Sequence, residues 1–99
     1  EGVYLEELDI TVEELSSEAV NSLGLDSKTS GILVKEVGDK NENLLNNDVI
    51  IQVSSEKIKD ISSFQSIIAN SIKLNRDKLL LRVIRDGNEF WLINPFIIE

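Results

Sequence analysis

Residues 46–68 read NNDVIIQVSSEKIKDISSFQSII, and this stretch decides the fold that the sequence predicts. The polar residues 46–48 favour a turn, and Val49–Val53 have the composition of a short apolar strand. Residues 54–57 then turn the chain back before a capped helix begins near Ser62. This order of turn, strand, turn and helix indicates a small domain in which strands and helices are mixed.

The helix in this stretch has a capping signal and an apolar face. The sequence SSFQ that starts at Ser62 has the form of a capping box. Phe64, Ile67 and Ile68 recur at helical spacing. We therefore expect a helix that packs one face on the core and ends by residues 74–75.

The residues after this helix predict a hairpin. Residues 78–85 (KLLLRVIR) carry apolar side chains on both faces, which is typical of a strand inside a sheet. Residues 86–87 (DG) are a strong two-residue turn signal, and residues 88–93 form the return strand. Pro95 has no N–H to donate and should end that strand. Residues 96–99 form an apolar tail that either packs down or continues into a linker.

The first half of the chain predicts two more strands. Residues 3–8 (VYLEEL) partly alternate between apolar and polar, and residues 31–37 (GILVKEV) are rich in branched side chains. Residues 44–45 (LL) fit a short helix or turn that plugs the core.

A helix is expected between these two strands, with an ambiguous start. Thr11 fits a helix cap because Glu14 stands three residues later, but Ser16 or Ser17 fits as well. Apolar residues follow at helical spacing, and Gly24 fits the helix end.

These elements together predict an α+β fold, a partly open barrel or sandwich of five to six short strands capped by two helices. The 99 residues, of which 41% are hydrophobic, fit one small domain with a single modest core.

The composition excludes several kinds of chemistry. The chain has no cysteine and no histidine, which excludes disulfides, zinc-finger spacings and a histidine base. Ser54 or Ser55 could formally pair with Lys57 as a nucleophile, but these residue types are usually ordinary turn residues. The acidic residues lack EF-hand spacing, and the five glycines are isolated rather than grouped in a phosphate loop. We expect no catalytic activity, metal or cofactor.

The net charge and the hydropathy of the chain limit the kinds of partner that it can bind. A net charge of −8 repels phosphate, so we expect no nucleic acid partner. No apolar run approaches the roughly 20 residues of a membrane-spanning helix. Glu1 opens directly into a patterned strand, so we also expect no signal peptide. What remains is a binding surface, because a sheet edge beside an apolar helix face can accept an extended peptide as an added strand.

The order of short motifs resembles a PDZ domain of the permuted bacterial kind found in HtrA/Do (DegP/DegQ-like) serine proteases. Gly2 and Val3 resemble the end of the family's carboxylate-binding loop as it enters the peptide-binding strand. Residues 31–37 are similar to its G-hydrophobic-x-V-x-x-V strand, and residues 48–50 (DVI) to its G-D-V-I motif. Residues 85–87 are similar to its R-D-G hairpin.

The chain departs from the family pattern at the turn before Asp48. The family has A-G-L-x-P-G-D where this chain has ENLLNND, so only Leu44 and Asp48 remain. Asparagine replaces both glycines and can adopt similar backbone angles at some cost. A glycine usual after Val53 is also replaced, by serine. These losses suggest a divergent domain, such as the second PDZ domain of its chain, with weak peptide binding.

The resemblance implies one PDZ domain over residues 1–99, excised from a longer chain. In such a domain the ligand's terminal carboxylate meets the backbone amides near Gly2 and Val3. The ligand strand pairs with residues 4–6, and its last, apolar side chain enters a pocket against the helix. Either the candidate helix residues line this pocket or they are ordinary core. The implied peptide-binding residues are Gly2, Val3, Tyr4, Leu5, Glu6, Phe64, Ile67 and Ile68.

The resemblance also implies partners and a location. The partners would be peptides or unfolded-protein segments with apolar C-termini, and the other domains of a homo-oligomeric parent protease. That parent would be periplasmic or attached to the cell envelope, would serve protein quality control, and would carry its catalytic triad outside this chain. Two alternatives stay open: a degenerate PDZ domain with a structural or oligomerisation role, and a PDZ domain of a membrane-embedded protease or secretion-system protein.

Overall fold

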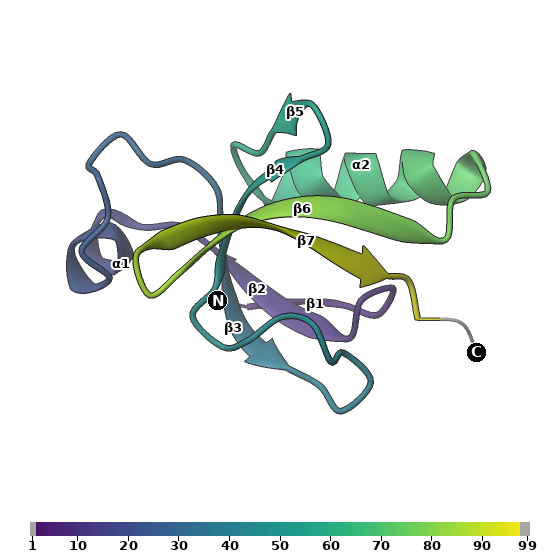
Figure 1. The fold of residues 1–99 in the computed structure, drawn as a ribbon, viewed down its shortest axis with the longest axis horizontal. Helices are drawn as coiled ribbons and strands as arrows, with labels where there is room; N and C mark the ends of the chain where they lie inside the picture. The colour runs from purple at the N-terminus through teal and green to yellow at the C-terminus, as the bar shows by residue number, and fades with distance from the viewer. Residues whose placement is uncertain (1, 98–99) are drawn as a thin grey trace.

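A computed structural model of the chain describes residues 2–97. One antiparallel sheet runs through the molecule in the order β1-β2-β3-β4-β6-β7, and β5 pairs with β4 off this path. Figure 1 shows α1 at one end of the molecule and α2 along its length. The elements are β1 (Val3–Leu5), β2 (Ile10–Glu14), α1 (Ser17–Ser22), β3 (Ile32–Val37), β4 (Val49–Val53), β5 (Glu56–Lys57), α2 (Ile61–Lys73), β6 (Lys78–Arg85) and β7 (Asn88–Pro95).

The predicted class, an open sheet with two helices in an α+β arrangement, is confirmed within the described residues. The strand number was underestimated, because the sheet has seven strands rather than five or six. One extra strand is β5, which the sequence presented only as a turn. The other is β2, which was predicted to be the start of a helix.

Strand β2 corrects the assignment of residues 11–15. Ile10 and Val12 are fully buried while Thr11 between them is half-exposed, which is the alternation of a strand and not of a helix. Helix α1 starts later, where the Ser16 hydroxyl accepts a hydrogen bond from the Ala19 N–H at 3.1 Å. The start near Thr11 was therefore wrong, and the alternative start at Ser16 is confirmed.

Helix α2 is capped two residues earlier than predicted. The Asp60 carboxylate accepts a hydrogen bond from the Ser63 N–H at 2.8 Å, and the Ser63 hydroxyl accepts one from the Asp60 N–H at 3.3 Å. These reciprocal bonds form a capping box in which Asp60, not Ser62, is the cap. The predicted end is confirmed, since Leu74 is the last cap residue and Asn75 turns the chain with a φ of 62°.

The turns around β4 and β6 agree with their sequence signals. Asn47 has a φ of 75°, so asparagine does take the left-handed conformation there. Asp86 and Gly87 both have positive φ, as a two-residue hairpin turn requires. Strand β6 lies between β4 and β7 inside the sheet, and β7 ends at Pro95, as predicted.

The predicted plug at residues 44–45 is half correct. Leu44 is buried in the core, whereas Leu45 is exposed, and no helix forms there. At the start of β3, Gly31 lets the chain pass close to β4, because a Cβ atom there would overlap the Ile50 carbonyl oxygen.

The core lies between the sheet and α2. The N–H of Ile97 donates a hydrogen bond to the Glu7 carbonyl at 2.8 Å, so the tail packs down as far as the described residues reach. Residues 98–99, the end of the predicted tail, and Glu1 lie outside the described part of the chain. No helix within residues 2–97 is long and apolar enough to cross a membrane. The largest fully buried side chains are Phe64, Leu8, Ile10, Ile32, Leu44, Ile50, Ile58 and Leu81.

Candidate binding groove

The sheet ends beside helix α2 in strand β1. Its three residues pair antiparallel with β2 in the register Val3↔Val12, Tyr4↔Thr11 and Leu5↔Ile10. Leu5 is only 4% exposed and points into the core, whereas Tyr4 is 59% exposed and points away from it. The strand therefore contributes one apolar side to the interior and one aromatic side chain to the surface.

Helix α2 is fastened to the far end of β2. The Glu14 carboxylate accepts hydrogen bonds from the Ile61 N–H, at 3.1 Å and 3.3 Å to its two oxygens. This N–H is one of the unpaired donors in the first turn of the helix, where a carboxylate also suits the helix dipole. The contact fixes the distance between the helix and the sheet at one end of the groove.

A groove of about 380 Å³ lies between β1 and α2. The strand side is formed by Tyr4 and Leu5 and by the residues that follow them, and the helix side by Gln65, Ile68 and Ala69. The helix residues share one flank because they are three and four positions apart. The groove thus has an apolar floor and polar rims.

The loop at residues 6–9, between β1 and β2, closes one end of the groove. The N–H of Leu8 donates a hydrogen bond to the Leu5 carbonyl at 3.2 Å. Asp9 has a φ of 53°, a conformation that glycine adopts more easily. The loop thus enters β2 at Ile10, and the left-handed Asp9 stands between the apolar residues Leu8 and Ile10.

This loop is held by three other parts of the chain. The Leu8 carbonyl accepts a hydrogen bond from the Asn41 side chain at 2.8 Å. The Asp9 carbonyl accepts one from the Gly38 N–H at 2.8 Å, and its carboxylate accepts one from the Lys40 N–H at 3.0 Å. Together with the bond between Ile97 and Glu7, these contacts hold the loop from parts of the chain other than β1.

The Asp9 carboxylate also accepts a hydrogen bond from the Tyr4 hydroxyl at 2.6 Å. This bond, followed by the bond from the Lys40 N–H, lowers the pKa of Asp9 below its ordinary value. The side chain of Tyr4 is therefore tied to the loop at the end of its own strand.

The structure brings together part of the residue set predicted from the sequence. Tyr4, Leu5, Glu6 and Ile68 line the groove, and Gly2 and Val3 precede them at the sheet edge. Phe64 is fully buried beneath it as a core residue. Ile67 does not face the groove, because it lies on the other flank of the helix.

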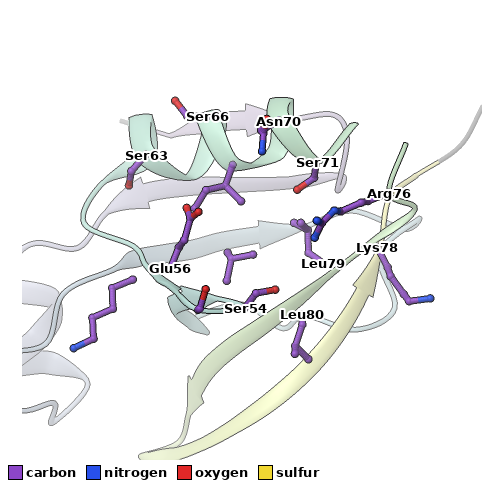
Figure 2. A pocket seen from close by; sticks show the side chains of 14 residues that line it. Ser54, Glu56, Ser63, Ser66, Asn70, Ser71, Arg76, Lys78, Leu79 and Leu80 are labelled. Carbon is purple, nitrogen blue, oxygen red and sulfur yellow. The ribbon is translucent and has the colours of Figure 1, made fainter. Parts of the chain in front are cut away.

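That other flank borders a second, more polar cavity of about 590 Å³. Figure 2 shows it between α2 and the turn after β4, with Ser63 and Ser71 on the helix side and Ser54 on the turn side. Ile67 belongs to this cavity. Helix α2 therefore forms one wall of each opening.

Sequence reasoning missed several residues of the groove. Gln65 and Ala69 line it but were not predicted, although their spacing to Ile68 could have placed them on its flank. Leu8 and Ile10, fully buried on either side of Asp9, carried no signal in the sequence, because Asp9 and not glycine holds the left-handed position between them.

The fold of this chain is similar to that of the PDZ domains of HtrA-type proteases. A crystal structure of the HtrA3 PDZ domain bound to the phage-derived ligand FGRWV superposes with a TM-score of 0.70 at 20% identity, covering 98% of this chain and 86% of that one. This level of identity supports the fold alone. The resemblance predicted from the sequence is confirmed at the level of the fold.

The HtrA-type protease AlgW, in a structure with a decapeptide, superposes with a TM-score of 0.72 at 27% identity. The match covers 99% of this chain but only 29% of the AlgW chain. The present chain thus spans less than a third of the length of that protease. No protein-family model matches the sequence, and no curated protein matches it significantly.

Proposed function

We propose that this chain is a peptide-binding PDZ module that accepts an extended peptide as an added strand beside α2. The observation that carries the proposal is the groove itself, which has a sheet edge on one side and an apolar helix flank on the other. Backbone hydrogen bonds along a sheet edge give affinity, and side-chain pockets beside the edge give selectivity. Both similar structures, of HtrA3 and AlgW, hold a peptide.

The ligand preference that we propose is for an apolar side chain at the end nearest the loop. The HtrA3 ligand FGRWV has a glycine second, an aromatic residue fourth and an apolar residue last. Residues of the same kinds follow in the same order in this chain, Gly2, Tyr4 and Leu5, and the last two line the groove. The pocket around Leu5, with Ile68 beside it, therefore suits an apolar end residue.

The wider role that we propose is substrate recognition or regulation within an HtrA-type serine protease of the periplasm or cell envelope. Residues 1–99 would be one PDZ domain of that longer chain, and the triad and the contacts of a homo-oligomer would lie in its other parts. The coverage of AlgW, 29% of its length, supports this division. The domain itself would bind and not catalyse.

A peptide titration followed by NMR tests the binding function. Peptides of five residues with apolar ends, among them FGRWV, are added to the ¹⁵N-labelled chain and to a Leu5→Ala variant. We expect amide shifts in residues 2–12 and at Gln65, Ile68 and Ala69 of α2, and none in the turn at Ser54 and Ser55 beside the other cavity. An absence of shifts at millimolar peptide in both proteins would favour the structural or oligomerisation alternative instead.

A further inference from the structure

Strand β1 lies where an added ligand strand would lie. Strand β2 has two edges, of which β3 pairs with one and β1 with the other. Without β1, the edge of β2 would be the end of the sheet, and helix α2 would stand beside it, fastened through Glu14 and Ile61. This open edge next to a helix is the site at which an extended peptide adds to a sheet in a PDZ domain.

The end of β1 is also held as the end of a ligand would be. The Leu5 side chain is buried in the same core cluster as Ile10 and Ile68, like an apolar end residue in its pocket. The Leu5 carbonyl accepts a hydrogen bond from the Leu8 N–H, in the loop that enters β2. The receiving loop is therefore residues 7–9, and the receiving strand is β2.

We propose that residues 2–5 are an intramolecular ligand that occupies the edge of β2 beside α2, so that an outside peptide pairs with this edge only after β1 has left it. The proposal rests on the proposed function of the groove and adds its regulation. It also changes the roles predicted from the sequence, since Gly2 to Leu5 become the bound segment and Leu8 to Val12 the receptor.

The contacts of β1 are few enough for exchange. The strand pairs over three residues, whereas β6 and β7 pair over eight. Outside the ladder, the bonds of β1 include those of the Leu5 carbonyl and of the Tyr4 hydroxyl to Asp9, and the Leu5 side chain packs in the core. The loop that would receive a new ligand is held by Asn41, Gly38 and Ile97, so it keeps its shape when β1 leaves.

The expected strength of this competition follows from the tether. Residues 6–9 join β1 to β2, and a short tether gives an effective concentration on the order of millimolar. If the segment binds with a dissociation constant about ten times lower than that concentration, it weakens the binding of an outside peptide about tenfold.

A reversible lock on the full chain tests the proposal. Tyr4 and Thr11 are direct partners in the ladder, and neither is buried, so a Tyr4→Cys/Thr11→Cys variant can form a disulfide there. The chain has no other cysteine, so the bond is unambiguous. Peptide affinity is measured by NMR or calorimetry for the oxidised variant and again after reduction, with FGRWV and with the segment's own sequence, EGVYL, as probes.

We expect the oxidised variant to bind both probes at least about tenfold more weakly than the reduced one. A Leu5→Ala variant, whose internal ligand lacks its buried side chain, should bind them about fivefold more tightly than the unmodified chain. Equal affinities in the oxidised and reduced states would overturn the proposal while leaving peptide binding intact. If neither the reduced variant nor Leu5→Ala binds any probe, the proposed function itself fails, and the internal ligand with it.

Discussion

The guanidinium of Arg85 binds the carboxylate of Asp48 through two hydrogen bonds, from Nε to Oδ1 at 2.9 Å and from Nη2 to Oδ2 at 2.7 Å. Asp48 is 1% exposed and also accepts the Leu45 N–H at 2.8 Å. A second bond from Nη2 reaches the Asn43 carbonyl at 3.0 Å. The pair therefore joins the hairpin of β6 and β7 to the turn at residues 43–48, and it raises the pKa of Arg85.

Replacing this arginine should destabilise the fold. Arg85→Gln leaves a buried carboxylate without its cation, which costs about 3 kcal/mol of unfolding free energy. Arg82→Gln on the same strand is the control, because Arg82 pairs with Glu89 at the surface and such pairs contribute less than about 1 kcal/mol. Urea unfolding of both variants measures the difference, and equal losses would contradict the assigned role of Asp48.

The hydrogen bond from Tyr4 should be visible in the titration of Asp9. A carboxylate whose pKa is lowered in the folded state stabilises the fold above its unfolded pKa, and this contribution is lost as the pH falls through the folded value. Tyr4→Phe removes the largest cause of the lowering, so the pKa of Asp9 should rise toward its ordinary value, and the stability lost on acidification should be smaller and complete at a higher pH. Carboxyl ¹³C shifts followed against pH measure it; an unchanged Asp9 pKa would exclude this bond.

A bulky residue at Ala69 should block the groove. Ala69 is exposed on the flank of α2 that faces β1, so Ala69→Arg places a long side chain where a ligand's residues would lie. We expect peptide affinity to fall about tenfold, a loss of about 1.4 kcal/mol. Ser62→Arg, exposed on the same helix and lining neither cavity, is the matched control and should bind as the unmodified chain does. Equal losses in both variants would place the ligand elsewhere.

The loop should favour a ligand without a terminal charge. Glu6 and Glu7 line the end of the groove and have no ion-pair partner among the described residues, and at present the loop holds the neutral Leu5 carbonyl. A ligand carboxylate there meets like charges, which raise its binding free energy. A peptide with a C-terminal amide should therefore bind at least as tightly as the free acid in low salt. A free acid that binds more tightly would show that the loop amides outweigh the two glutamates.

The fold was predictable where local signals had no competitor. The turn at Asp86 and Gly87 admits few conformations, and the apolar run from Lys78 to Arg85 could only be an inner strand. Residues 11–14 fit a helical capping box and also alternate between apolar and polar as a strand does. The capping box predicted a helix there, which was wrong. Residues 10–14 form a strand because it buries Ile10 and Val12 in a core made of distant parts of the chain. Such long-range contacts cannot be predicted from the spacing of neighbouring residues.

The sequence predicted a groove between a sheet edge and a helix, but it did not predict which helix residues, loop and strand form it. The helix flank followed from periodicity, but a periodic helix does not say which of Ile67 and Ile68 faces which neighbour. The receiving loop was hidden because Asp9 adopts the backbone conformation for which glycine is the usual signal. Only the pairing register of β1 with β2 shows which strand lies at the edge.

Helix α2 is a partition between the groove and the polar cavity. Ile68 faces the first and Ile67 the second, although one peptide bond separates them. A sideways displacement of α2 away from β1 is also a displacement toward the turn after β4, so space gained on one flank is lost on the other. A molecule that pushed α2 sideways from one opening would therefore narrow the other.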